Sequence, residues 1–230
     1  MKNKIRDNEM DVVFLLDRSG SMRGLESDTI GGFNSMIDKQ RSEPGEALIT
    51  TVLFDDKYEV IHDRFRMDMI RPLTDEDYYA RGCTALLDAV GGAIHHIANV
   101  HKYAREEDRP EKTLFIITTD GMENSSHIYT YDKVRKMVEM EKEKYGWEFL
   151  FLGANMDAVE VAGRFGIGAD RAMNYECDSE GTRLNYQVLS ETVSAVRRSK
   201  TKMEMDAAVF ACCAPIREDY GKRHKKSRRG

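Results

Sequence analysis

DVVFLLDRSGS, residues 11–21, is the stretch of sequence that decides the fold. Its first six residues are continuously apolar after Asp11, as expected of a strand buried on both faces of a sheet. The chain then changes abruptly to an acid and two serines around Gly20, a composition typical of a turn. A strand covered on both faces needs helices on each side, so this stretch predicts a parallel sheet inside an α/β domain.

Apolar runs of strand length alternate with segments of helical period along the rest of the chain. Further strands are predicted at Ala47–Phe54, Thr113–Thr118, Trp147–Leu152 and Ala172–Tyr175. Apolar residues recur at helical spacing in the segments between and after them, namely 25–37, 86–97, 134–145, 159–165 and 184–196. This order predicts a doubly wound, mostly parallel sheet with helices on both faces.

One edge of the sheet is expected to be antiparallel. Asp55-Asp56 reads as a turn, and the alternating side chains of residues 58–63 then read as the second strand of a hairpin. The polar stretch 64–82, which contains Pro72, is predicted to be a long surface connection.

The charge of the chain is unevenly distributed. The 230 residues carry a formal net charge of −5, but six Lys and Arg side chains and no acid occur in residues 221–230. The rest of the chain is therefore acidic and a poor platform for nucleic acid, whose non-specific binding depends on phosphate neutralisation. We expect residues 199–230 to form an appendix with a disordered basic tail, where weak contact with nucleic acid is confined.

The composition predicts a cytoplasmic protein. The first apolar run, Val12–Leu16, is too short for a secretory signal, and Ala207–Ile216 falls short of the roughly 20 residues that span a bilayer. The vicinal pair Cys212-Cys213 is awkward to bridge, which favours reduced thiols. The four cysteines include no CxxC pair, so a zinc site is not expected.

Polar side chains with hard oxygen atoms follow two of the predicted buried strands. Asp17, Ser19 and Ser21 come after the first strand, Asp120 follows TLFIIT, and Thr84 stands before a helix. Ligands of such sheets bind beyond the carboxyl ends of the strands, where the strand order reverses. Carboxylate and hydroxyl oxygens suit Mg²⁺ or Mn²⁺ better than zinc. Each piece alone has a simpler reading as a turn or a helix cap, but their joint occurrence predicts a metal site.

Three segments, DVVFLLDRSGSM, RGCTALLDAV and LFIITTDGMEN, resemble the metal-ion-dependent adhesion site of von Willebrand factor A domains. The resemblance covers about residues 9–198, so we expect residues 1–198 to form the domain. It implies direct coordination by Ser19, Ser21 and Thr84 when a ligand is bound, with Asp17 and Asp120 acting largely through water.

The resemblance implies an adaptor rather than an enzyme. A cation held mainly by hydroxyls and water stays electrophilic and takes up an anionic oxygen, such as a Glu or Asp carboxylate of a partner protein. Bacterial proteins that resemble this chain often act as metal-dependent adaptors beside ATPases or stress-response systems, and we expect a bacterial origin.

Two other classes of function share parts of this pattern. A metal-dependent phosphatase or hydrolase of the haloacid-dehalogenase type also places Asp after the first strand, but it needs a second Asp where this chain has Ser19, a poor proton donor. A serine-hydrolase elbow would need glycines in place of Asp17 and Ser21. A nucleic-acid-associated protein would use the basic tail.

Overall fold

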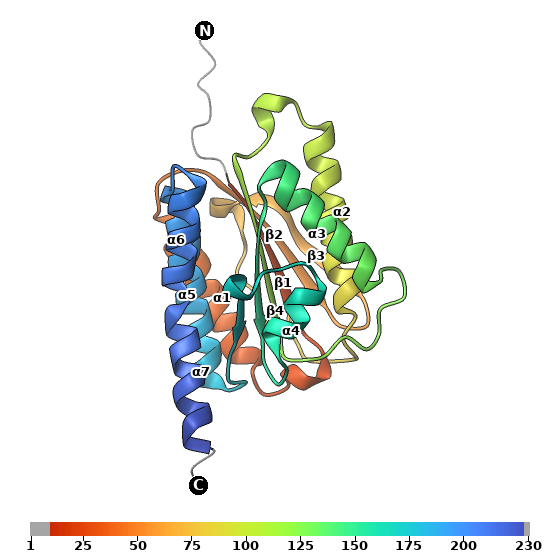
Figure 1. Cartoon of the computed structure of the whole chain (residues 1–230), viewed down its shortest axis with the longest axis vertical. Helices are drawn as coiled ribbons and strands as arrows, with labels where there is room; N and C mark the ends of the chain where they lie inside the picture. The colour runs from red at the N-terminus through yellow and green to blue at the C-terminus, as the bar shows by residue number, and fades with distance from the viewer. Residues whose placement is uncertain (1–9, 228–230) are drawn as a thin grey trace.

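The computed structural model describes residues 10–227 and contains a single six-stranded sheet (Figure 1). Its strands are β1 (Met10–Asp17), β2 (Ala47–Phe54), β3 (Tyr58–Arg66), β4 (Lys112–Thr119), β5 (Glu148–Gly153) and β6 (Ala172–Asn174). They lie in the order β3-β2-β1-β4-β5-β6, and β2–β3 is the antiparallel pair while the others are parallel. The predicted fold class is therefore confirmed, the antiparallel edge strand included.

Helices cover both faces of the sheet. They are α1 (Glu26–Arg41), α2 (Leu86–Tyr103), α3 (Tyr131–Tyr145), α4 (Ala158–Arg164), α5 (Ser179–Arg198), α6 (Lys202–Cys212) and α7 (Ala214–Ser227). Figure 1 shows α1, α5, α6 and α7 on one side of the sheet and α2 and α3 on the other. None of these helices combines the length and the apolarity that crossing a membrane requires.

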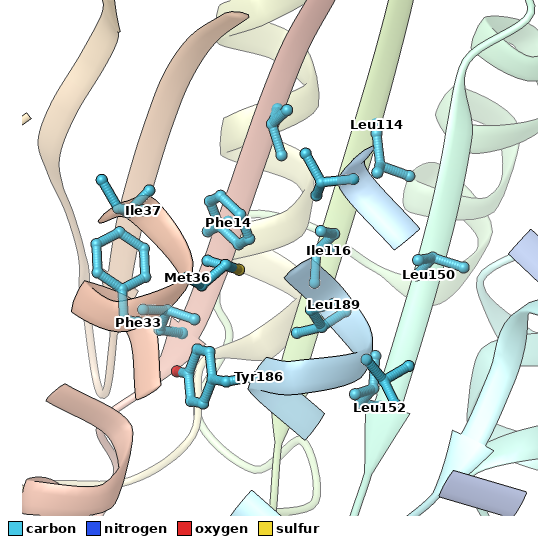
Figure 2. Packing of buried hydrophobic residues seen from close by; sticks show 14 of the residues in the cluster. Phe14, Phe33, Met36, Ile37, Leu114, Ile116, Leu150, Leu152, Tyr186 and Leu189 are labelled. Atoms are coloured by element: carbon cyan, nitrogen blue, oxygen red, sulfur yellow. The ribbon is translucent and has the colours of Figure 1, made fainter. Parts of the chain in front are cut away.

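Each face of the sheet has its own hydrophobic core. On the α1 and α5 face, Phe14 of β1 packs with Phe33, Met36 and Tyr186, as Figure 2 shows. On the opposite face, alternate strand residues such as Phe115 pack with the apolar residues of α2, α3 and α4. The central strands are thus buried on both sides, which explains their continuously apolar sequences.

The register of the central strands brings two loops together. Asp17 lies beside Phe54 of β2, and Leu16 lies beside Thr118 of β4. The strand order reverses between β1 and β4, because β1 is followed in sequence by β2 on one side and has β4 on the other. The loops after β1 and β4 therefore leave the same edge of the sheet at adjacent positions, where ligands of such folds bind.

The prediction of a surface connection over residues 64–82 is wrong in part. Strand β3 continues to Arg66, and Met67, Ile70, Leu73 and Tyr78 are all buried in the core on the α1 side. These apolar residues are separated by polar ones without a helical or strand period, so pattern reading found no element there. These four buried side chains anchor the segment to the domain, whereas Phe65, Met69 and Tyr79 remain exposed.

The prediction of a disordered basic tail is also wrong for the residues up to Ser227. Helices α6 and α7 lie against the domain, and Met205, Val209, Cys213 and Ile216 belong to the core on the α1 side. Arg223 forms ion pairs with Asp178 and Glu180 at 2.6 and 2.9 Å. The four apolar residues recur every three or four positions, as on one face of a helix, and they precede the basic residues of the tail. Residues 228–230, which carry the last two arginines, lie outside the described part of the chain.

Candidate functional site

The loop after β1 is held against the loop that carries Thr84. The amide of Gly20 donates a hydrogen bond to the carbonyl oxygen of Gly82 at 3.1 Å, and the amide of Arg81 donates to the carbonyl oxygen of Arg18 at 2.8 Å. A Cβ at position 20 would lie 3.2 Å from that same Gly82 oxygen, closer than most side chains tolerate. Glycine at position 20 therefore permits the close approach of the two loops.

Four of the predicted oxygen-bearing side chains converge beside Gly121. The hydroxyls of Ser19 and Ser21 are 3.0 Å apart, and Ser21 donates to Oδ1 of Asp120 at 2.5 Å. A Cβ at Gly121 would lie 2.6 Å from Oγ1 of Thr84, 3.2 Å from Oγ of Ser21 and 3.4 Å from Oγ of Ser19. The three hydroxyls therefore surround one point, with the Asp120 carboxylate hydrogen-bonded to one of them.

Asp17, the fifth predicted residue, supports the loop after β1 through hydrogen bonds of its side chain. Its side chain is buried, Oδ1 accepts from the amide of Ser19 at 2.7 Å, and Oδ2 accepts from the hydroxyl of Thr119 at 2.5 Å. Burial raises the pKa of the Asp17 carboxyl to about 6, although hydrogen bonds from Thr119 and Ser19 act in the opposite direction. All five predicted residues thus belong to one cluster at the carboxyl edge of the sheet.

Exposure within the cluster is graded. Ser19, Thr84 and Asp120 are buried, whereas Ser21 is exposed. Met122, two residues after Asp120, is also exposed. The cluster is therefore open to solvent on the Ser21 side, where an approaching group can reach the oxygens.

Hydroxyl and amide groups that the sequence reading missed hold the cluster in place. The hydroxyl of Tyr78 donates to the backbone carbonyl of Asp17, at the base of the loop. Asn124 forms two hydrogen bonds with the backbone of Thr84. Its side-chain Oδ1 accepts from the Thr84 amide at 2.9 Å, and its backbone amide donates to the Thr84 carbonyl oxygen at 3.1 Å. Tyr78 and Thr119 belong to no recognisable motif, so the sequence alone does not point to them.

The loop after β4 is tied to the start of α2 by two buried or half-buried acids. Oε2 of Glu123 accepts from the amide of Leu87 at 2.8 Å. The Asp88 carboxylate accepts from three consecutive amides, those of His127, Ile128 and Tyr129, at 2.8 to 2.9 Å. These contacts fix the Thr84 and Asp120 loops relative to each other.

Arg18, between Asp17 and Ser19, is buried and connects the site to the β2–β3 turn. Its Nε lies 2.8 Å from Oδ2 of Asp55, and its Nη2 lies 3.0 Å from Oε2 of Glu59. Arg81 contacts the same Asp55 oxygen at 2.7 Å. The guanidinium groups hold the pKa of Asp55 below its usual value, so this carboxylate stays charged.

Cys177, between β6 and α5, contacts the second oxygen of Asp120. Its Sγ lies 3.3 Å from Oδ2 of Asp120. Burial raises the pKa of the Cys177 thiol to about 12, so the thiol keeps its proton and donates to the carboxylate. The contact orients Asp120 from the side opposite Ser21.

The donor set fits a hard divalent cation. Within the described residues no group of three or more His, Cys, Asp or Glu side chains could hold a metal ion, so any metal at this edge depends on hydroxyl oxygens. Three hydroxyls and a carboxylate are the hard donors that Mg²⁺ and Mn²⁺ prefer. The chemistry of the cluster suits such an ion better than zinc, which favours nitrogen and sulfur ligands.

Comparison of the sequence with protein-family models and with curated proteins finds no match. Comparison of the structure finds a von Willebrand factor type A protein from Catenulispora acidiphila, at a TM-score of 0.55 and 14% identity, over 81% of this chain and 43% of that one. Proximal thread matrix protein 1 from the mussel byssus is similar at a TM-score of 0.52 and 14% identity, over 79% of this chain and 45% of that one.

The chain thus spans less than half the length of the solved structures that it resembles. At these identities the likeness concerns the fold alone. The order of the strands, the antiparallel edge and the helices on both faces agree with that likeness. The chain has the fold of a von Willebrand factor A domain.

Proposed function

We propose that this chain is a divalent-cation-dependent protein-binding domain that captures an acidic side chain of a partner. Ser19, Ser21 and Thr84 would hold the cation directly, and Asp17 and Asp120 would support it largely through water. When bound, the cation would supply a Lewis-acidic position for a Glu or Asp carboxylate of the partner. A protein-binding role in general is in keeping with the fold.

The convergence of three hydroxyl oxygens around the position beside Gly121 carries this proposal. Neutral hydroxyls leave most of a cation's charge uncompensated, which favours one further anionic ligand. The exposed Ser21 lies on the open side, so a carboxylate from another molecule has access. The cluster offers no general acid beside Asp17, because Ser19 stands where a phosphotransferase would need one, and we therefore propose a binding protein rather than an enzyme.

A cytoplasmic location of the protein is part of the proposal. All four cysteines are free, and Cys213 is buried, which supports a reducing compartment such as the cytoplasm. The nucleic-acid alternative has less support than the sequence suggested, because Arg223 of the basic segment is paired with acids of the domain.

The first test removes one hydroxyl without changing shape. Thr84→Val deletes Oγ1, while the backbone of Thr84 keeps its two hydrogen bonds to Asn124. We expect Mn²⁺ or Mg²⁺ binding, measured by titration calorimetry, to weaken at least tenfold, because a direct ligand is lost. Thr113→Val, the same change in β4 at the opposite end of the sheet, should leave cation binding unchanged.

The second test blocks the position itself. Gly121→Ala would place a methyl group 2.6 Å from Oγ1 of Thr84, so we expect the cation to be excluded while the domain stays folded. Gly31→Ala in α1 adds a methyl group that meets nothing within 4 Å, and it should bind the cation normally. Equal cation affinity in both variants would contradict the proposed position.

Capture of a partner is tested separately from cation binding. A pull-down from cell lysate with the wild-type chain should recover partner protein in Mg²⁺ and lose it in excess chelator, and the Asp17→Ala and Thr84→Val variants should fail in both conditions. Partner recovery that persists unchanged in chelator would contradict a cation-dependent mechanism, even if the cation binds.

A further inference from the structure

A small cavity lies beside Asp17 of the candidate site, between the sheet and helices α1 and α5. Its lining includes Asp17 and Tyr78, together with Thr29 of α1, Thr118 of β4, and Thr182 and Asn185 of α5. The volume open to the centre of a water molecule is about 10 Å³. That volume is close to the minimum that holds one ordered water.

The cavity collects polar atoms that have no partner. Among the described residues, seven buried side-chain nitrogen or oxygen atoms lack a hydrogen bond, and four of them line this one cavity. These four are Oγ1 of Thr29, Oγ1 of Thr118, Oγ1 of Thr182 and Oδ1 of Asn185. Their residues are at most 9% exposed, so bulk water cannot satisfy them.

Helix geometry does not account for these atoms. A buried helical threonine can satisfy its hydroxyl on the carbonyl one turn earlier, as Thr192 of α5 does on Val188 at 2.8 Å. Thr182, in the first turn of the same helix, makes no such bond. Leaving a buried polar group unpaired costs about 1–3 kcal/mol, so a cluster of such atoms around one cavity points to a shared partner.

We propose that this cavity binds an ordered water molecule, which links Thr118 of β4 to Thr182 and Asn185 of α5. A buried water makes about three hydrogen bonds, which matches the convergent hydroxyls and the amide oxygen. The Tyr78 hydroxyl is committed to the Asp17 carbonyl, so the water lies beside the residue that supports the base of the first loop. The water is a structural component of the edge that carries the candidate site.

A monovalent cation is a poorer occupant than water. The four free oxygens belong to neutral groups, and both carboxylate oxygens of Asp17 already accept hydrogen bonds. An uncompensated buried cation carries a large desolvation cost.

The direct test is a crystal structure at a resolution that shows ordered waters, with crystals grown in RbCl. We expect one density peak within hydrogen-bond distance of Thr118, Thr182 and Asn185, without an anomalous signal from rubidium. An anomalous peak would show that a monovalent cation, not water, occupies the cavity. An empty cavity whose hydroxyls pair with one another would show that nothing is bound there. Either result overturns the inference.

A second test uses the energetic signature of a shared partner. Thr118→Val and Asn185→Leu each remove one polar group and leave the water and the remaining oxygens poorly paired, so each should lower the urea midpoint. The triple variant that also carries Thr182→Val removes three of the four unpaired polar side chains, and it should be destabilised by clearly less than the sum of the three single changes. Strictly additive shifts would contradict a shared water.

None of these three residues belongs to the candidate cation site, so the result is independent of the proposed function. Thr113→Val, on the same strand as Thr118 but at its other end, is the matched control and should leave the urea midpoint close to that of the wild type, because its hydroxyl does not line the cavity. Cation titration of the same variants shows whether the cavity and the site are separable.

Discussion

Asp17 is a buried carboxylate whose two oxygens are both used within the protein. One accepts from the Ser19 amide and the other from the Thr119 hydroxyl, so Asp17 joins the loop after β1 to the end of β4. Burial nevertheless disfavours its charged form and raises its pKa to about 6. The residue is therefore poised to lose its charge under mildly acidic conditions.

The raised pKa of Asp17 predicts a distinct pH dependence of stability. In chelator, Asp17 takes up a proton in the folded protein near pH 6 but in the unfolded chain only near pH 4, so the folded state is favoured by protonation. The free energy of unfolding should therefore fall as pH rises from about 4 to about 6, and stay lowered above that. A shift of about 2 pKa units corresponds to at most about 3 kcal/mol.

Asp17→Asn removes the titrating carboxyl group, so comparing this variant with the wild type isolates the contribution of Asp17 to the pH dependence of stability. The difference in unfolding free energy between the variant and the wild type, from urea denaturation between pH 4.5 and 7.5, should grow in favour of the variant as pH rises. A difference that does not change with pH would mean that Asp17 titrates at its ordinary value in the folded protein.

At the level of single residues, the sequence identified the oxygen donors but not what holds them. Asp17, Ser19, Ser21, Thr84 and Asp120 lie at loop starts, where the position in the chain implies a position at the sheet edge, and the structure brings them together. Thr119 and Tyr78 act through hydrogen bonds between segments distant in sequence, which no local spacing records.

At the level of elements, helix α3 shows how a single backbone conformation ends a helix. Gly146 follows Tyr145 with φ of +68°, in the left-handed region, and its amide donates to the carbonyl of Lys142 at 3.1 Å. A residue with a Cβ is strained in this conformation by about 1–2 kcal/mol. The helix therefore ends at Tyr145, where the predicted helical segment 134–145 also ends.

Gly146→Ala should therefore destabilise the domain by about 1 kcal/mol, although a Cβ there meets no atom within 4 Å. Gly163 of α4 is the matched control, because a Cβ there also meets nothing within 4 Å while its backbone is helical. Gly163→Ala should be neutral or stabilising by up to about 1 kcal/mol. Thermal unfolding measures both, and equal effects would contradict the conformational explanation.

Elements with a strong period were predictable, and elements with sparse apolar residues were not. The buried strands and the helices up to α5 lie where the alternating pattern placed them. The segment after β3 and the helices α6 and α7 contribute only isolated apolar residues to the core, such as Leu73 and Val209. Burial of such residues depends on where the whole domain places them, and sequence spacing alone does not show it.

At the level of the whole molecule, α6 and α7 complete the core on the α1 side. Ile216 of α7 is 1% exposed, whereas Phe210 of α6 is 56% exposed. Ile216→Ala should lower the free energy of unfolding by about 2–4 kcal/mol, because a buried aliphatic side chain is lost. Phe210→Ala removes a larger side chain and should change it by less than about 1 kcal/mol.

Chemical denaturation followed by the fluorescence of Trp147, on the opposite face of the sheet, reports this effect. A single transition shifted by Ile216→Ala would show that the C-terminal helices unfold with the domain. An unchanged Trp147 transition would instead mean that α6 and α7 form a separately melting appendix.

The two outermost strands bear on how this molecule can associate with others. Strand β6 is three residues long, and β3 carries Glu59, Asp63, Arg64 and Arg66, with an irregular register against β2. Short or charged and irregular edges are poor templates for backbone pairing with another polypeptide. The sheet is thus protected from growing sideways into fibres through backbone pairing with other molecules.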